Sequence, residues 1–277
     1  MASSGPAEAP GAARRRPLLQ ARRWRALASQ ALSAGVLAAG VIGPLPARAE
    51  TVLVAVASNF GPTLAALAPG FRQASGHDLT AAAGPTARLA LQITAGAPFH
   101  LLLSADQATP ARLLANGQAV PGTRFTYATG HLVLWSAQAG LVDSQGDVLA
   151  HGRFRHLALA NPKLAPYGEA AMAVLRARGL ADKLQARLVM AESIAQAYQF
   201  VSTGNAELGF VAWSQLKAPG QTPAGSHWRV PPGLHAPLHQ DAVLLLPGAG
   251  QPAALALLAY LKTPAAKALM QAHGYGG

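Results

Sequence analysis

The stretch Val54 to Leu67, VAVASNFGPTLAAL, predicts a buried strand that runs directly into a helix. Residues 51–57 are apolar and rich in β-branched side chains, as in a parallel strand that is covered on both faces. Apolar residues then recur with helical spacing at Leu64, Leu67 and Phe71. The stretch therefore indicates a strand–helix unit of an α/β protein.

Ser58 and Asn59 lie between this strand and this helix. Serine and asparagine often cap helices, because their side-chain oxygens accept hydrogen bonds from the free N–H groups of the first turn. The same hydroxyl and amide can instead turn outward and donate to an anion at the positive end of the helix dipole. From these two residues alone, both interpretations stay open.

The composition bounds the chain to one or two globular domains. It has 277 residues, 51% of them hydrophobic, and no cysteine, which excludes disulfides and thiolate metal sites. Seven of the 22 basic residues but only one of the 11 acidic residues precede Glu50, so 15 basic and 10 acidic residues remain from Glu50 onward. The formal charge of +11 therefore does not describe a basic folded surface, and we expect no nucleic-acid partner.

Residues 1–49 predict an export signal that is cleaved after Ala49. A basic region is followed by an apolar stretch at residues 26–42 and by the small-residue motif ARA at residues 47–49. An uncleaved membrane anchor stays an alternative, although the apolar stretch is short and interrupted by polar residues. Arginines at residues 22–23 also keep a twin-arginine export route open. We therefore expect a periplasmic protein.

The order of strand, small or hydroxylic residues and helix recurs along the chain. Further strands are predicted at residues 78–83, 101–103, 127–135, 156–160, 186–190, 204–211 and 242–246. Further helices are predicted at residues 107–116, 169–178, 195–201, 252–262 and 264–273, and an additional amphipathic helix carries Leu89, Leu91 and Ile93. This alternation favours mainly parallel sheets that are flanked by helices.

The chain is predicted to form two lobes. The strand at residues 127–135 is interpreted as the crossing into the second lobe, because a new α/β series follows it. Residues 218–238 are rich in proline and glycine and are expected to run along the surface before the chain returns. We predict lobe 1 at residues 50–129 and 236–277 and lobe 2 at residues 130–235, with a hinge of two crossing segments.

Motifs for catalysis and for phosphate or dinucleotide binding are not found in the sequence. His235 and His239 are four residues apart, but Pro237 between them prevents the helix that would direct both to one metal ion. The few acidic residues form no recognisable catalytic pair. We therefore expect no enzyme, no catalytic residue, no metal site and no cofactor.

Five segments resemble the periplasmic molybdate-binding protein of bacterial ABC transporters, in the same order over nearly all of residues 50–277. They are VAVASNF (54–60), AGPTARLALQITAGAPFHLLLSADQ (83–107), LANPKLAPYGEAA (159–171), AYQFVSTGNAELGFVAWSQ (197–215) and ALMQAHGYG (268–276). The resemblance implies a two-lobed type II periplasmic-binding fold. It also implies a protein that captures molybdate or tungstate between its lobes and delivers it to a membrane permease.

The resemblance further implies that uncharged donors hold the oxyanion. The positions that match the family's donors are Ser58 and Thr86 through their hydroxyls, and Tyr167 and Ile194 through their main-chain N–H groups. Asn59 matches the asparagine of a subgroup whose first motif begins with Ser-Asn or Thr-Asn. Ala212 stands where many members have a tyrosine donor, so the resemblance implies that Asn59 supplies the missing contact.

A site made only of donors suits a fully deprotonated oxyanion, because the proton of hydrogen phosphate would find no acceptor there. Sulfate is expected to bind weakly, since its shorter bonds do not span donors set for a larger ion. Two other functions stay open: a binding protein for another oxyanion or small organic anion, and an exported enzyme on the same scaffold. An enzyme would need a titratable group in the cleft, and the matched loops offer none. The molybdate-receptor interpretation implies a monomer.

Overall fold

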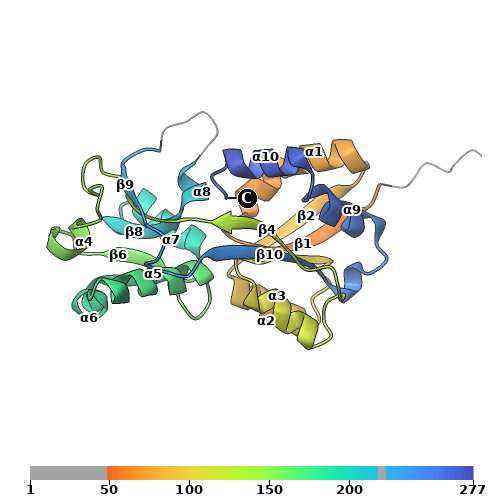
Figure 1. The fold of residues 1–277 in the computed structure, drawn as a ribbon, viewed down its shortest axis with the longest axis horizontal. Coiled ribbons are helices and arrows are strands. Elements are labelled where there is room, and N and C mark those ends of the chain that lie inside the picture. Colours follow the sequence, from red (N-terminus) through yellow and green to blue (C-terminus); the bar gives the residue numbers. More distant parts are fainter. Residues whose placement is uncertain (1–48, 218–222, 277) are drawn as a thin grey trace, which may run out of the picture. The chain divides into compact units, whose positions relative to one another are not determined.

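Two five-stranded sheets carry the fold in the computed structural model, which describes residues 49–217 and 223–276 (Figure 1). The strand order is β2-β1-β3-β10-β4 in the first sheet and β7-β6-β8-β5-β9 in the second. The expected export signal lies, apart from Ala49, outside the described residues.

The first sheet contains mostly strands of one direction. Its strands are β1 (Thr51–Ala57), β2 (Asp78–Gly84), β3 (Leu101–Leu103), β4 (Phe125–Gly130) and β10 (Leu238–Leu244). Its helices are α1 (Gly61–Ser75), α2 (Thr86–Thr94), α3 (Ala108–Ala115), α9 (Pro252–Tyr260) and α10 (Pro264–Ala272), with the 3-10 turn η2 (Leu246–Gly248). Strand β1 pairs in parallel with β2 and β3, whereas β10 is antiparallel to β3 and β4. Only β10 therefore opposes the direction of its sheet.

The second sheet repeats this plan. Its strands are β5 (Leu132–Ser136), β6 (Leu157–Ala160), β7 (Leu188–Ala191), β8 (Leu208–Ala212) and β9 (Ser226–Arg229). Its helices are α4 (Val148–His151), α5 (Pro166–Ala177), α6 (Ala181–Leu184), α7 (Ile194–Ser202) and α8 (Trp213–Leu216), with the 3-10 turn η1 (Gln185–Arg187). Strand β6 is parallel to β7 and β8, and β5 is antiparallel to β8 and β9. The prediction of mainly parallel sheets flanked by helices is confirmed.

Helices cover both faces of the first sheet, which explains the continuous apolar run of β1. Helices α1, α9 and α10 lie on one face, and α2 and α3 lie on the other (Figure 1). Phe60, Leu64 and Phe71 are fully buried on the first face, and Leu89 and Leu113 are buried on the second. Each such side chain contributes roughly 1.5–3 kcal/mol through removal from water.

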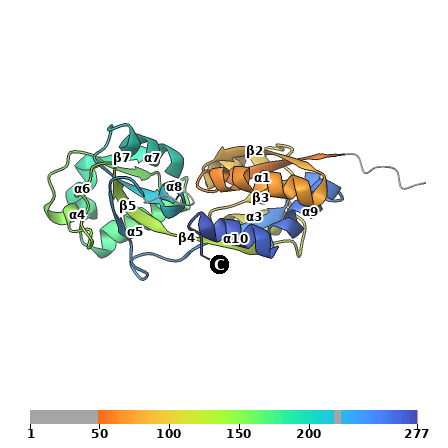
Figure 2. The ribbon, with the colours of Figure 1, turned by 90° about the horizontal axis from the view of Figure 1, so that it is seen from above.

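The chain passes between the two sheets twice, as predicted (Figure 2). The first passage is at His131, which separates β4 from β5, and the second connects β9 to β10 through residues 230–237. The prediction of one strand over residues 127–135 is wrong, because its two halves pair in different sheets.

Three further details differ from the sequence-based expectation. Strand β9 forms inside the stretch expected to have no regular structure; it is an edge strand in which Trp228 is buried and Arg229 is exposed, so its apolar pattern is weak. Helix α5 begins at Pro166 instead of residue 169. Leu91 is 67% exposed, because two residues along a helix turn a side chain by about 200° from the buried Leu89.

Within the described ranges, a single helix long and apolar enough to cross a bilayer is not found. Helices α9 and α10 meet the length and composition test only when they are taken together, and their axes are bent by 63° at the break between them.

Candidate functional site

A small cavity lies where strand-to-helix loops of the two sheets meet. Its volume is about 10 Å³, which is room for one small group. Its lining consists of Ala57, Ser58, Asn59, Gly84, Pro85, Thr86, Ala105, Ala165, Pro166, Tyr167 and Ile194. The structure thus brings all five site residues expected from the sequence to one cavity, and none of the described residues that line it carries a formal charge.

Ser58 occupies the loop between β1 and α1. Its main-chain N–H donates to the carbonyl oxygen of Gly84 over 3.0 Å, which fixes the loop against the end of β2. The N-cap of α1 is Phe60, and no side chain caps this helix. The interpretation of Ser58 and Asn59 as side-chain caps is therefore wrong. Ser58 instead lines both the cavity and a larger pocket of about 610 Å³ beside it.

The Asn59 side chain is buried and held by the protein itself. Its Nδ2 atom donates to Gln240 Oε1 over 3.0 Å and to the Tyr275 hydroxyl over 3.1 Å. Both amide protons are therefore committed. Across residues 49–217 and 223–276, no hydrogen bond from the main-chain N–H of Asn59 to a protein acceptor is found. This N–H is the group that Asn59 has available for a ligand.

Thr86 begins helix α2, whose N-cap is Pro85 and which has no side-chain cap. The Thr86 hydroxyl is buried and accepts a hydrogen bond from the main-chain N–H of Ala105 over 3.3 Å. Because this contact uses only a lone pair, the hydroxyl proton remains able to donate. The bond from Ala105 thereby orients Thr86 as a donor at the cavity.

Tyr167 is the second residue of helix α5, after Pro166. The N-cap, Ala165, has extended backbone angles and provides no side-chain cap, Pro166 has no N–H, and the Gly168 N–H donates to the carbonyl oxygen of Ala165 over 2.9 Å, so in the described part of the chain the Tyr167 N–H is the first-turn donor that lacks a partner. Gly168 permits this geometry, because a Cβ there would overlap the carbonyl oxygen of Ala160 at the end of β6. The helix start therefore approaches the sheet closely, and Tyr167 lines the cavity with its ring buried.

Ile194 is the first residue of helix α7. Ser193 caps this helix through its side chain, which accepts from the main-chain N–H of Gln196 over 3.2 Å. That cap leaves the N–H of Ile194 without an acceptor inside the helix. The helix dipole places partial positive charge at the same point, as it does at the starts of α2 and α5. The cavity therefore combines hydroxyl and main-chain donors with positive dipole ends.

Direct contacts join the two sides of the site. The main-chain N–H of Ala87, from the first sheet, donates to the carbonyl oxygen of Leu164, from the second, over 3.1 Å. Arg88 Nη1 and Glu192 Oε2 form an ion pair of 3.0 Å at the 610 Å³ pocket next to the cavity. Both of these side chains are more than half exposed, so the ion pair contributes at most about 1 kcal/mol.

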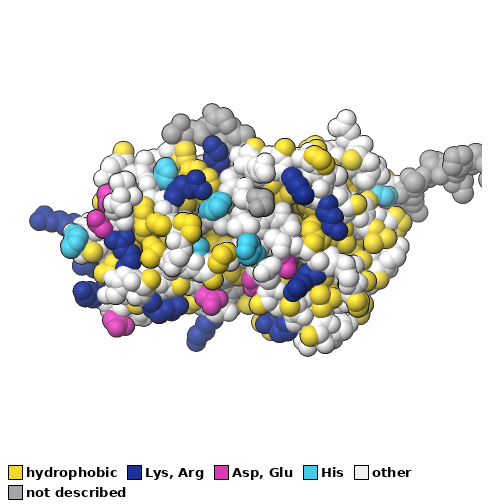
Figure 3. All heavy atoms as spheres, viewed as in Figure 1, with side chains coloured by type: hydrophobic (Ala, Val, Ile, Leu, Met, Phe, Trp, Pro, Cys, Tyr) yellow, Lys and Arg dark blue, Asp and Glu magenta, His cyan; other side chains and the backbone are white. Residues whose placement is uncertain are grey.

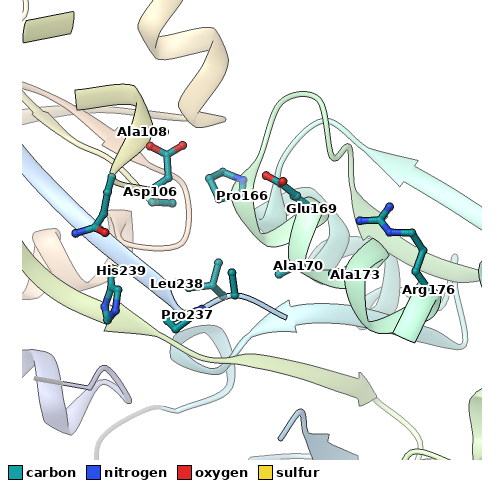
Figure 4. A pocket seen from close by; sticks show the side chains of 13 residues that line it. Asp106, Ala108, Pro166, Glu169, Ala170, Ala173, Arg176, Pro237, Leu238 and His239 are labelled. Atoms are coloured by element: carbon teal, nitrogen blue, oxygen red, sulfur yellow. The ribbon is translucent and has the colours of Figure 1, made fainter. Parts of the chain in front are cut away.

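A third pocket lined from both sheets has a volume of about 270 Å³ (Figure 4). Asp106 lies on its first-sheet side, and Glu169 and Arg176 lie along helix α5 on the other side, with His239 below (Figure 4). Two carboxylates make this pocket unfavourable for a dianion.

Among the described residues, a group of three or more His, Cys, Asp or Glu side chains that could hold a metal ion is not found.

Three buried phenols are hydrogen-bonded to Asn59 or Gln240, and one of them, Tyr167, also lines the cavity. Burial raises the pKa of Tyr275 to about 12 and raises the pKa of Tyr127 and of Tyr167 well above the usual value, and neighbouring phenols add to both of these shifts. All three hydroxyls therefore keep their protons at physiological pH and can donate.

The sequence did not reveal Gln240 or Tyr275 as part of the site's surroundings. A polar pair, Gln240 and Asp241, directly precedes the apolar residues of β10, and both side chains are buried. This pair of polar residues beside an apolar strand segment was the sequence feature that could have indicated Gln240.

Ala212, the position of the family's tyrosine, is fully buried at the end of β8, and its N–H donates to Gln215 Oε1 over 2.9 Å.

The comparisons with known proteins agree with one another. The profile of the bacterial extracellular solute-binding protein family matches residues 52–276. The molybdate-binding protein ModA of Azotobacter vinelandii is 50% identical over 246 residues, which cover 89% of this chain and 95% of that protein. The molybdate-binding protein ModA of Rhodobacter capsulatus is 47% identical over 248 residues, which cover 89% of this chain and 97% of that protein.

A solved structure gives the same answer for the fold. The periplasmic molybdate-binding protein of Azotobacter vinelandii superposes with a TM-score of 0.80 and 42% identity, over 82% of this chain and 99% of that chain. The proteins matched in sequence and in structure are solute-binding proteins. The chain therefore belongs to the bacterial extracellular solute-binding proteins and, within them, to the periplasmic molybdate-binding proteins.

Proposed function

We propose that this protein captures molybdate or tungstate in the small cavity and delivers it to the membrane permease of an ABC transporter. The observation that carries the proposal is the neutral cavity at which the loops after β1, β2, β6 and β7 converge. Its donors are the hydroxyls of Ser58 and Thr86 and the main-chain N–H groups of Asn59, Tyr167 and Ile194.

Neutral donors suit a buried dianion. A lysine or arginine at this depth would itself have to lose its water, at a cost of several kcal/mol. Main-chain N–H groups at helix starts spread the compensating positive charge over several dipoles without that cost. The two anion charges are therefore balanced without a formal countercharge in the cavity lining.

The donor-only lining sets the selectivity. Ser58 and Thr86 supply the hydroxyls that we assign as donors, beside the main-chain N–H groups, and none of the described side chains that line the cavity is a carboxylate or an imidazole. A protonated oxyanion would bury an O–H without an acceptor, which costs about 1–3 kcal/mol. Sulfate is fully deprotonated, so its rejection rests on its smaller size. In the part of the chain that the structure describes, a carboxylate or imidazole of the kind that an enzyme would require does not line the cavity.

The remaining features follow from the same role. Lobe 1 comprises residues 50–129 and 236–277, lobe 2 comprises residues 130–235, and the two passages between the sheets serve as the hinge. The protein acts in the periplasm as a monomer without a cofactor and without enzymatic activity. Lysine and arginine side chains are dispersed on the face seen in Figure 3, and this pattern favours a protein without a nucleic-acid partner.

The test is calorimetric titration of the ligand-stripped protein with molybdate, tungstate, sulfate and phosphate. We expect one-to-one binding of the first two, with sulfate and phosphate at least about 100-fold weaker. Ser58→Ala should weaken molybdate binding by roughly 10- to 100-fold, the value of a hydrogen bond to a charged group. Equal affinity for sulfate and molybdate would contradict the proposed selectivity, and absence of binding would refute the function.

A further inference from the structure

A cluster of buried polar side chains lies at the junction of the two sheets, outside the cavity lining except for two members. It consists of Gln240, Asn59, Tyr127, Tyr167 and Tyr275, each at most 6% exposed. Gln240 lies on β10, the strand reached after the second passage between the sheets, and is fully buried. Such a cluster is costly to bury unless every polar atom has a partner.

The Gln240 side chain makes contacts in both directions. Its Oε1 atom accepts from Asn59 Nδ2 over 3.0 Å, and the Tyr127 hydroxyl lies 3.0 Å from the same oxygen. Its Nε2 atom donates to the Tyr167 hydroxyl over 3.2 Å. One amide thus connects the β1–α1 loop of the first sheet with the start of α5 in the second.

Gly130 also supports this connection, from the strand that precedes the first passage between the sheets. It ends β4, and a Cβ at this position would overlap the Tyr167 hydroxyl and come within 2.6 Å of Gln240 Nε2. The Tyr167 hydroxyl therefore packs against β4 at Gly130 and against β10 at Gln240, the two strands that adjoin the passages between the sheets. Only glycine leaves room for the pair at this point.

We propose that Gln240 is a positioning residue of the oxyanion site, which sets the main-chain donors of Asn59 and Tyr167 at a fixed separation by binding both side chains. The inference rests on the proposed function, because it assigns a role within that site. Gln240 does not line the cavity. It acts on the ligand only through the two residues that it holds.

The effect of losing this amide follows from its burial. Without Gln240, the Tyr167 hydroxyl and one Asn59 proton would each lose a partner in a region without access to water. Burial keeps the Tyr167 phenol protonated, so it cannot compensate by ionising. The distance between the start of α5 and the Asn59 loop would then vary. Because both carry donors to the ligand, the ligand would dissociate faster.

The test compares Gln240→Met, Tyr167→Phe and the double variant, in the protein isolated from the periplasm of an expression host. Tyr167→Phe removes the hydroxyl but keeps the main-chain donor, and methionine approximates the size of glutamine. The dissociation rate of tungstate is measured by stopped-flow fluorescence. We expect each single variant to release tungstate about 3- to 10-fold faster, and the double variant to be no faster than Gln240→Met.

Tyr127→Phe is the matched control. It makes the same chemical change at a buried phenol whose contacts, Ser104 and Gln240, both belong to the first sheet. It should lower the melting temperature but change tungstate dissociation less than twofold. A purely structural role of Gln240 would make Tyr127→Phe and Tyr167→Phe equal in dissociation rate, and that result would overturn the inference.

Other outcomes are equally decisive. Multiplicative effects in the double variant would show that Gln240 and Tyr167 act independently, which would also overturn the inference. If Gln240→Met does not fold, Gly130→Ala provides the second probe, with the same expected 3- to 10-fold acceleration. An unmodified protein that does not bind tungstate would refute the proposed function; normal binding with unchanged variants would refute only the role of Gln240.

Discussion

The hydroxyl of Tyr275 donates to the carbonyl oxygen of Asn59 over 2.9 Å, although 216 residues separate the two in the chain. The same hydroxyl accepts from Asn59 Nδ2. Gly276, the next residue, pairs with Thr129 of β4 through two main-chain hydrogen bonds of 2.8 and 2.9 Å. Tyr275 and Gly276 therefore hold the loop between β1 and α1 against the strand that leads to the second sheet.

Replacing Tyr275 by phenylalanine should loosen this loop. Asn59 would lose the shorter of two hydrogen bonds to its carbonyl oxygen, the other coming from the Ser214 hydroxyl over 3.4 Å, and the acceptor of one side-chain proton, so we expect molybdate affinity to fall about 3- to 10-fold. Calorimetric titration measures the change. Tyr260→Phe is the control, since Tyr260 packs on Phe71 with ring centroids 5.8 Å apart and lies outside the cavity. Equal effects of both substitutions would argue against the loop-holding role.

Alkaline titration should distinguish the buried phenols. Burial raises the pKa of Tyr275 to about 12, above the value near 10 of an unfolded chain. The stability that this phenol contributes is therefore complete below about pH 10 and is lost as the pH rises towards 12. We expect tyrosinate absorbance from Tyr127, Tyr167 and Tyr275 to develop together with loss of the circular dichroism signal. Full ionisation of all tyrosines in a protein that remains folded at pH 11 would disagree with this assignment.

Ile194→Pro removes the main-chain N–H at the start of α7 while keeping a residue type that fits the first helical position. Ser193 before it has extended angles of φ −138° and ψ 164°, close to those that a residue before proline adopts. Molybdate affinity should fall about 10- to 100-fold. Ile194→Ala loses the same buried packing but keeps the N–H, so its affinity should stay within about threefold. A similar loss in both variants would mean that packing, not the N–H, matters here.

Thr86 provides a test of the hydroxyl donors. Thr86→Val keeps the shape but removes the oxygen that accepts from the Ala105 N–H, so both ligand affinity and stability should fall. We expect at least a 10-fold loss of affinity and a loss of about 1–3 kcal/mol in the free energy of unfolding. Thr86→Ser retains the hydroxyl and should bind within about threefold of the unmodified protein. Calorimetry and thermal denaturation measure the two effects; full affinity in Thr86→Val would exclude the hydroxyl as a donor.

The Arg88–Glu192 ion pair should affect how fast the anion arrives. Glu192→Gln removes a negative charge at the 610 Å³ pocket and leaves Arg88 unpaired, so the association rate of molybdate should rise about two- to fivefold at low salt. The gain should vanish at about 0.5 M salt, where the screening length is only a few ångströms. Stopped-flow measurements at several salt concentrations provide the test, and a gain that persists at high salt would not be electrostatic.

The sequence predicted the parts of the site that are local in the chain. Ser58, Thr86 and Ile194 each follow a strand and precede or begin a helix, so their grouping follows from the common direction of parallel strands. The same rule does not give the direction of a side chain. Asn59 looked like a side-chain donor, yet its amide is directed to Gln240 and Tyr275, which lie far away in the sequence.

Long-range pairing explains the other differences. The division of residues 127–135 into β4 and β5 depends on which sheet each half joins, and no local pattern encodes that choice. Strand β9 likewise lies at the edge of its sheet and pairs there with β5, which is distant in the sequence. Gln240 lies just before the run of apolar residues in β10, and only the assembled structure gives its amide partners on both sides.

The most direct test of the central claim is a crystal structure with bound tungstate, in which anomalous scattering locates the metal atom. The account predicts one tungsten peak, within hydrogen-bonding reach through its oxygens of the Ser58 and Thr86 hydroxyls and of the main-chain N–H groups of Asn59, Tyr167 and Ile194. A peak in the 270 Å³ pocket beside Asp106 and Glu169, or coordination by a lysine or arginine, would contradict it.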